Sequence, residues 1–274
     1  MQPDSGAGGM TLQAFVQGIG VLGPGFSGWP SAAAALTGRT NYAPQPTVLP
    51  PPALLPPTEQ RRSGRVVKLA LAIASEAVAN AHAAPEQLRS VFSSSGGDGH
   101  NCHEICQVLA SEPREISPTR FSNSVHNASA GYWSIATGAT LASTVLCAFD
   151  GSFCAGLLEA LTQVCVDRAP VLLVAYDTEY PPPLHSKRPL PDAFGIGLVL
   201  APSRDDRSMA RLEAALGAGD ADVMRDSRLE ALRASIPAAR ALPLIRQLAL
   251  DEPGRVVLEY LDVHSVAVDV MPCR

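Results

Sequence analysis

The chain has 274 residues, which is enough for one large domain or two small ones. Its formal net charge of −5 argues against a nucleic-acid-binding surface. Hydrophobic residues make up 46% of the chain and charged residues only 17%, so we expect some apolar surface to meet a protein partner.

The N-terminus and the cysteines indicate the compartment. Residues 1–10 lack the basic and apolar regions of a signal peptide, and we expect them to form a disordered leader before a single domain at residues 11–274. No stretch of about 18 apolar residues is present, so no membrane span is expected. The six cysteines do not have the spacing of a disulfide scaffold, which favours a reducing cytoplasm.

The hydrophobic pattern predicts an α/β fold. Strands are expected at Leu12–Leu22, Leu88–Ser94, Ala142–Phe149, Val171–Tyr176, Phe194–Leu200, Arg211–Leu216 and Val256–Tyr260. Helices are expected at Trp29–Leu36, Ser63–Ala83, 101–110, Ser152–Cys165 and, with a break at Pro243, Ala231–Leu250. A proline-rich loop at residues 43–57 separates the first two helices, and the pattern at Arg211–Leu216 also allows a helix. The helix at Ser152–Cys165 joins two buried strands, which predicts a βαβ unit with parallel strands.

The segment from Thr144 to Leu161 has the pattern of an apolar strand, a tight turn at Asp150–Gly151 and an apolar helix. In several hydrolase and acyl-transferase folds a nucleophile lies at such a turn, next to the free N–H groups of the helix. Here the turn carries Asp150, which is also a preferred helix N-cap, so a purely structural role stays open. Cys147 precedes the turn within the predicted strand and is expected to be an unreactive core residue rather than a thiolate.

Two other patterns point to chemistry less strongly. Cys102, His103 and Cys106 resemble half of a zinc site, but no second ligand pair is present, so no metal is expected. The glycines after Ser94 do not form a nucleotide-binding motif, and we expect no cofactor. A serine–histidine–aspartate triad can be assembled without the usual G-x-S-x-G motif from Ser122 or Ser124, His126 or His185, and Asp150.

Four basic residues crowd the start of the helix predicted at Ser63–Ala83: Arg61, Arg62, Arg65 and Lys68. Positive charge at a helix N-terminus opposes the helix dipole, so these side chains are expected to serve another purpose. They form either a solvated face or a docking surface for an acidic partner.

Several segments, in order, are similar to the N-terminal half of a β-ketoacyl-ACP synthase of the thiolase fold. AFVQGIGVLGPGFSGWPSAAAALTGRTNY and RRSGRVVKLALAIASEAVANA resemble its first strand and helices, and VFSSSGGDG resembles its glycine-bearing strand end. PREISPTRFSNSVHNASAGYWSIATG resembles the dimer-interface segment, TVLCAFDGSFCAGLLEALTQVCVDRAPVLLVAYD the nucleophile unit, and DAFGIGLVLAP the closing strand. The resemblance covers roughly residues 14–216. It implies a single thiolase-like half, with a mostly parallel mixed five-stranded sheet flanked by helices.

The resemblance also implies that the family's catalytic groups are missing. Aligned without gaps, the nucleophile position falls on Asp150; a two-residue slip gives Ala148, and only a three-residue slip gives Cys147. The family's active-site histidines belong to the C-terminal half, and His264 lacks their motifs. Without a thiolate no acyl-enzyme forms.

The resemblance therefore implies that the chain is a non-catalytic subunit of the chain-length-factor type. It would form a heterodimer with a full-length β-ketoacyl-ACP synthase in type II fatty-acid or polyketide synthesis, such as an aryl-polyene system. In its dimer-interface segment, Phe121, Ser124 and Trp133 are candidates to line or cap the partner's acyl tunnel, or else pack at the interface, together with His126 and Asn127. A bulky side chain at the tunnel end would limit product length sterically.

Three alternatives stay open. The chain is a stand-alone acyl-thioester enzyme that uses Cys147 or Asp150, or a module that binds an acyl chain or an acyl carrier protein. The third alternative is a structural homodimer or scaffold.

Overall fold

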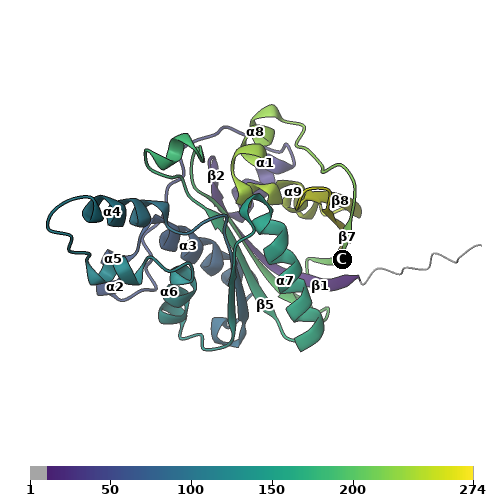
Figure 1. The fold of residues 1–274 in the computed structure, drawn as a ribbon. Coiled ribbons are helices and arrows are strands. Elements are labelled where there is room, and N and C mark those ends of the chain that lie inside the picture. The colour runs from purple at the N-terminus through teal and green to yellow at the C-terminus, as the bar shows by residue number, and fades with distance from the viewer. Residues whose placement is uncertain (1–10, 274) are drawn as a thin grey trace, which may run out of the picture.

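The computed structural model describes residues 11–273, so the leader expected at residues 1–10 lies outside the described residues. Its sheet has nine strands in the order β4-β3-β5-β6-β1-β7-β9-β8, with β2 paired to β1. The sheet runs through the middle of the molecule between helices (Figure 1). The strands are β1 (Leu12–Gly23), β2 (Phe26–Ser27), β3 (Arg89–Ser93), β4 (Ser143–Leu146), β5 (Val171–Asp177), β6 (Phe194–Ala201), β7 (Ala210–Gly217), β8 (Gly254–Glu259) and β9 (Ser265–Pro272).

The predicted βαβ unit is present. Helix α7 (Ser152–Asp167) connects β4 to β5, and both strands pair in parallel with β3 between them. Within residues 11–273 every other strand pairing is antiparallel. The expected single sheet flanked by helices is confirmed. The expected count of five mostly parallel strands is wrong, because β1 inserts between β6 and β7 and the C-terminal strands extend the sheet.

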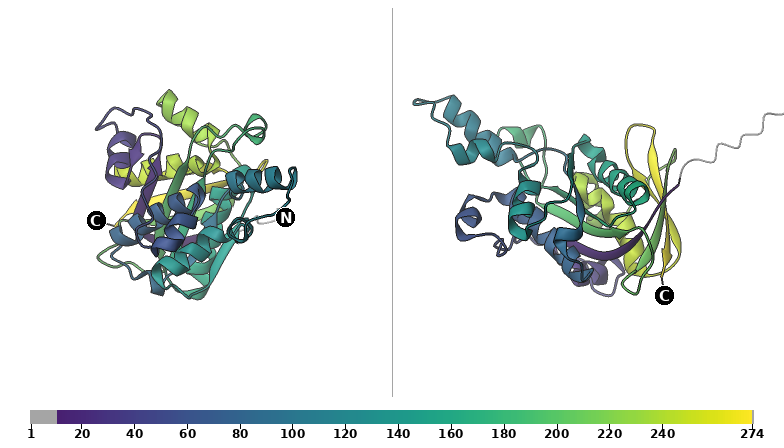
Figure 2. Two further views of the ribbon diagram at one scale, coloured as in Figure 1. Left: turned by 90° about the vertical axis from the view of Figure 1, so that its left-hand side faces the viewer. Right: turned by 90° about the horizontal axis from the view of Figure 1, so that it is seen from below.

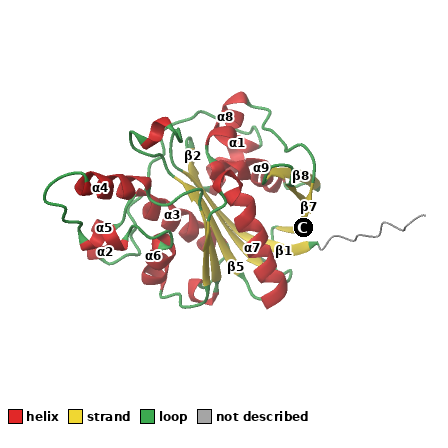
Figure 3. Ribbon diagram, viewed as in Figure 1, coloured by secondary structure: helices red, strands yellow, loops and turns green. Residues whose placement is uncertain are grey.

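Helices cover both faces of this sheet (Figure 3). Helices α3 (Arg65–Asn80) and α6 (Ala128–Thr137) pack on one face, and α1 (Trp29–Leu36), α7, α8 (Ser227–Ser235) and α9 (Leu242–Leu250) pack on the other. Alternate residues of β5 point into the two layers: Leu173 belongs to the cluster under α7 and Val174 to the cluster under α3. Burial on both faces explains why β5 is apolar without interruption from Val171 to Ala175.

Helix α3 lies unusually close to β1. A Cβ atom added to Gly18 would lie 2.1 Å from the carbonyl oxygen of Ala77, and one added to Gly20 would lie 2.2 Å from that of Ile73. Only glycine permits this contact between helix and strand backbones.

Several predicted boundaries are corrected by the structure. The long helix expected at Ala231–Leu250 is interrupted by Pro237, which begins a 3-10 turn (Pro237–Ala241), rather than by Pro243. Pro243 lies in the first turn of α9, where the absence of its N–H costs no helical hydrogen bond. The segment Arg211–Leu216 is a strand, and β9 is an additional strand that the sequence pattern had not indicated.

The proline-rich loop runs without a helix or strand to α2 (Pro57–Arg62). Helix α2 lies with α4 (Gly99–Leu109) and α5 (Pro118–Ser122) at the end of the molecule away from the C-terminal strands (Figure 2). The carboxylate of Asp98 caps α4 by accepting a 3.0 Å hydrogen bond from the backbone N–H of Asn101. No helix in the described part of the chain is long and apolar enough to cross a membrane.

Candidate functional site

The turn between β4 and α7 is a strained connection. Phe149 has a φ of +48°, which is rare for a bulky residue, and the residue is 61% exposed. The buried Ser152 stabilises the turn through its hydroxyl group. This hydroxyl accepts a 2.9 Å hydrogen bond from the Ala148 N–H and donates a 2.7 Å hydrogen bond to the Phe149 carbonyl oxygen. The strained residue is therefore Phe149, one position before Asp150.

Asp150 is held between two arginines. Its Oδ1 accepts a hydrogen bond from Arg188, and its Oδ2 accepts one from Arg240 at 3.1 Å. The Arg188 guanidinium also lies over the Phe149 ring, 3.9 Å from its centroid. Arg240 continues the network to Glu259 on β8, at 3.1 Å. Both arginines are far from the turn in sequence, and no local pattern could have indicated them.

Cys147 differs from the sequence expectation. Strand β4 ends at Leu146, so Cys147 lies outside it and is exposed rather than part of the core. The cause is the position of β4 at the edge of the sheet, where only β3 covers it. The Cys147 thiol donates a 3.2 Å hydrogen bond to the Ser95 carbonyl oxygen, and neither Asp150 nor a histidine bonds to it in residues 11–273.

A buried carboxylate lies behind the turn, at the end of β5. Asp177 is 4% exposed and accepts hydrogen bonds from the backbone N–H and hydroxyl of Ser95 and from the N–H of Ala238. Burial raises the pKa of Asp177 to about 6, although these donors partly oppose the rise. Asp177 thus joins the end of β3, the end of β5 and the turn before α9.

The structure separates the residues of the expected interface segment. Phe121 is 68% exposed, whereas Trp133 is 2% exposed and belongs to the core under α3. The Ser124 hydroxyl donates to the Phe121 carbonyl oxygen at 2.7 Å. His126 Nε2 lies 3.2 Å from the Ser94 hydroxyl, and burial lowers the pKa of this imidazole. Asn127 precedes α6 without capping it through its side chain.

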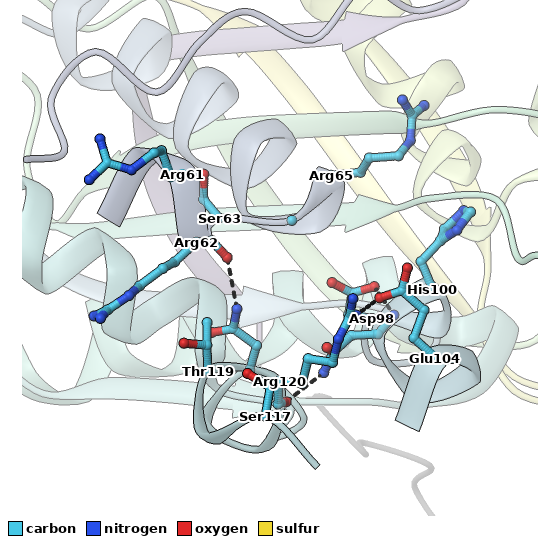
Figure 4. A pocket seen from close by; sticks show the side chains of 13 residues that line it. Arg61, Arg62, Ser63, Arg65, Asp98, His100, Glu104, Ser117, Thr119 and Arg120 are labelled. Atoms are coloured by element: carbon cyan, nitrogen blue, oxygen red, sulfur yellow. Dashed lines mark hydrogen bonds and ion pairs between the residues drawn. The ribbon is translucent and has the colours of Figure 1, made fainter. Parts of the chain in front are cut away.

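The basic residues near α3 do not form one group. Arg61, Arg62 and Arg65 line a polar pocket of about 450 Å³ between α2, α3, α4 and α5, together with Arg120 (Figure 4). Lys68 instead borders an apolar groove beside the proline-rich loop. Sequence reasoning missed Arg120 as a member of the basic group, because it lies on α5, far away in sequence.

The charges in this pocket are partly compensated. Arg62 pairs with Glu59 at 2.9 Å, Arg65 pairs with Glu179 at 2.7 Å, and Arg120 pairs with Glu104. Arg61 has no ion pair within the described residues. Arg61 and Arg62 belong to the last turn of α2, where positive charge favours the helix dipole. The expected conflict with the dipole of α3 is therefore wrong for these two.

The remaining sequence candidates are not assembled into sites. Within the described residues, no group of three or more histidine, cysteine and acidic side chains could hold a metal ion. The hydrogen bonds of Ser124, His126 and Asp150 lead to other partners, so the described contacts do not link them as a triad.

Comparison of the sequence with protein families identifies the class. A model of the β-ketoacyl synthase N-terminal domain matches residues 31–251. This match spans well over half of the chain, so the chain belongs to the β-ketoacyl synthase N-terminal domain family. A search of curated proteins gave no match.

Solved structures with similar folds include ketosynthase complexes. The ketosynthase ApeO in complex with its chain length factor ApeC from Xenorhabdus doucetiae matches with a TM-score of 0.71 and 22% identity over 94% of this chain and 99% of that chain. The ishigamide ketosynthase/chain length factor matches with a TM-score of 0.70 and 14% identity, over 95% and 99%. AntDE:AntF, a type II acyl carrier protein in complex with its ketosynthase, matches with a TM-score of 0.74 and 10% identity, over 96% and 100%. At these identities the likeness establishes the shared fold.

Proposed function

We propose that this chain is a non-catalytic, chain-length-factor-type subunit that pairs with a full-length β-ketoacyl-ACP synthase. The observation that carries the proposal is the state of Asp150 at the strand–helix turn. Both carboxylate oxygens of Asp150 are bound by Arg188 and Arg240, so neither is free to attack a thioester, and the turn carries no thiolate. Complexes of a ketosynthase with its chain length factor among the similar folds support the same role.

The open edge of the sheet is the partner surface that we favour. Strand β4 pairs with β3 on one side and with no described strand on the other. The opposite edge is partly occupied, because Asp222 exchanges two 2.8 Å hydrogen bonds with the backbone of Val257 in the middle of β8. An uncovered edge strand readily pairs with another chain.

Exposed apolar side chains lie in the segments that precede and follow β4 in the sequence. Between the end of α5 and α7 five large apolar residues are more than two-fifths exposed: Phe121, Val125, Ile135, Leu141 and Phe149. Apolar surface of this kind on a chain with few charges favours a permanent protein partner over solvent. We assign the segment from Phe121 to Phe149 to the interface with the synthase.

Phe121 is the residue that we propose to reach the partner's acyl tunnel. Its ring is free to enter a neighbouring chain, whereas Trp133 is already packed in the core of its own chain. Ser124, His126 and Asn127 then support the shape of the segment that presents Phe121. We propose that product length is limited by the volume of this ring.

Docking of an acyl carrier protein is a second role, and one observation favours it. Arg61, which lines the pocket beside the proposed interface segment, has no ion pair within the described residues, while Arg62, Arg65 and Arg120 are paired with glutamates. An acidic carrier helix would complement this charge and would be steered to it. We place the complex in the cytoplasm, because all six cysteines are free thiols, which suits a reducing compartment.

Reconstitution with the synthase tests the proposal. We expect the chain alone to give no condensation product from acyl and malonyl thioesters, and the pair to give products of a defined length. A stand-alone enzyme that uses Cys147 or Asp150 would instead turn over thioesters without the synthase, and Cys147→Ser or Asp150→Asn would abolish that turnover. Unchanged products with and without this chain would contradict the proposed role.

A further inference from the structure

Asp150 is not a helix cap, although its position before α7 and its residue type suggest one. The N-cap of α7 is Gly151, and no side chain caps the helix there. Both carboxylate oxygens of Asp150 are instead bound by guanidinium groups, Oδ1 by Arg188 and Oδ2 by Arg240. The two arginines come from different parts of the chain, so the arrangement is a tertiary contact and not local capping.

The arginines around this carboxylate are more buried than those of surface ion pairs. The side chains of Arg188 and Arg240 are 19% and 13% exposed, whereas that of Arg255, which pairs with Asp269 on the sheet surface, is 63% exposed. A partly desolvated guanidinium without an anion is costly. Arg240 also has Glu259, but Asp150 is the only carboxylate that pairs with Arg188 within residues 11–273.

The same contacts connect three segments. Arg188 lies in the loop between β5 and β6, Arg240 lies in the 3-10 turn before α9, and Asp150 lies between β4 and α7. Arg188 also covers the Phe149 ring, so the loop closes over the strained turn.

The ends of this loop are held elsewhere, because Glu179 pairs with Arg65 and Asp192 accepts a hydrogen bond from the Thr47 N–H. Two charge-assisted hydrogen bonds to one carboxylate can therefore fix the middle of the loop, around Arg188.

We propose that Arg188 and Arg240 form a carboxylate-binding site, that Asp150 is its built-in ligand, and that its occupancy fastens the loop at residues 178–193 over the turn. Removal of the Asp150 carboxylate leaves a site for a small free carboxylate such as formate. The inference concerns the isolated chain and requires no ketosynthase. It shares the pairing of Asp150 with Arg188 and Arg240 with the proposed function, and the reconstitution with the synthase tests that function separately.

Chemical rescue tests the inference. Asp150→Ala removes the carboxylate and retains the methylene carbon as a methyl group, so formate supplies the missing group. We expect Asp150→Ala to lower Tm and formate to raise Tm progressively at constant ionic strength, as a ligand that binds only the folded state does. Chloride should not reproduce the rise. The double variant Asp150→Ala with Arg240→Gln should lose the response to formate.

Asp269→Ala is the matched control, because it removes the carboxylate of an exposed pair with Arg255. Formate should not stabilise this variant beyond the wild-type protein. Equal responses of Asp150→Ala, Asp269→Ala and the wild type would overturn the proposal, as would the absence of any response.

Hydrogen exchange gives a second measurement on the milder Asp150→Asn variant, which serves if Asp150→Ala does not fold. Its side-chain oxygen can accept a hydrogen bond from one arginine, but its NH₂ group cannot accept one from the other. We expect amides at residues 178–193 to exchange faster in Asp150→Asn than in the wild type, and those of α3 to exchange at the same rate. Unchanged exchange at residues 178–193 would contradict the proposed fastening.

Discussion

Asp177 and Ser95 are joined by two hydrogen bonds to one carboxylate oxygen. Asp177 Oδ1 accepts from the Ser95 backbone N–H at 2.8 Å and from the Ser95 hydroxyl at 2.6 Å. The pair ties the end of β3 to the end of β5, directly behind the turn that carries Asp150. Because Asp177 is buried, its protonation is coupled to the stability of this region.

The first prediction concerns pH. Burial raises the folded-state pKa of Asp177 from 3.8 to about 6, so the charged form is disfavoured in the folded chain. This carboxyl group therefore makes its full contribution to stability below its unfolded pKa, and the contribution is lost as the pH rises towards 6. The loss is of the order of 3 kcal/mol, at about 1.4 kcal/mol for each pKa unit.

Urea unfolding of the wild type and Asp177→Asn at a series of pH values between 4 and 7 checks this. The free energy of unfolding of the wild type should fall relative to that of Asp177→Asn across this range. Asp177→Asn carries no titratable group at this position, so its free energy of unfolding should not show this fall. Parallel pH profiles of the two proteins would show that Asp177 does not cause the pH dependence of the free energy of unfolding.

The second prediction concerns the contact between α3 and β1. Gly18→Ala would place Cβ 2.1 Å from the carbonyl oxygen of Ala77, so helix and strand must move apart. We expect a loss of about 1–3 kcal/mol in the free energy of unfolding. Gly217→Ala on β7 is the control, because nothing lies within 4 Å of its added Cβ. Similar stabilities of the two variants would show that the close contact between α3 and β1 does not require glycine at position 18.

The third prediction concerns product length. With the ketosynthase present, Phe121→Ala should lengthen the product, because a smaller side chain leaves room for more of the growing chain. The isolated chain should keep its stability, since the Phe121 ring is mostly exposed. Trp133→Ala provides the contrast: its burial predicts a loss of about 3–5 kcal/mol in stability. Identical product lengths for Phe121→Ala and the wild-type pair would contradict the tunnel assignment.

The fourth prediction concerns the edge of the sheet. Ser90 N–H and Ser94 N–H donate to the carbonyl oxygens of Ala142 and Leu146, so alternation along the strand turns the backbone groups of Val145 outward. Val145→Pro would remove an outward N–H without breaking the ladder with β3. We expect at least tenfold weaker binding to the ketosynthase, about 1.4 kcal/mol, measured by titration calorimetry.

The control for Val145→Pro is thermal unfolding of the isolated chain. An unchanged Tm with weakened binding assigns the effect to the interface. Full affinity in a well-folded Val145→Pro variant would exclude β4 as the docking edge.

Local sequence patterns predicted the parts of the fold that depend on neighbouring residues. The buried strand predicted at Val171–Tyr176 and the amphipathic pattern of α3 each reflect burial within one element, and both were confirmed. The order of the strands depends on contacts between distant segments. Nothing in the sequence of β1 indicates that it pairs with both β6 and β7.

In the candidate site, too, contacts between distant segments could not be predicted from local sequence patterns. The strand–turn–helix segment with Asp150 is visible in the sequence, but its arginine partners are 38 and 90 residues away. Cys147 was expected in the core because its neighbours are apolar, and the edge position of β4 exposes it. Trp133 and Phe121 are both aromatic residues of one segment, and only the fold separates the core residue from the surface residue.

Size-exclusion chromatography with light scattering tests the central claim most directly. Three samples would be measured: the chain alone, of 28.7 kDa, the ketosynthase encoded nearest to it alone, and an equimolar mixture of the two. We predict that the mixture elutes as a stable complex whose mass is the sum of one copy of each chain. A chain that elutes apart from the ketosynthase, as a monomer or as a homodimer of two copies, would contradict the proposed role.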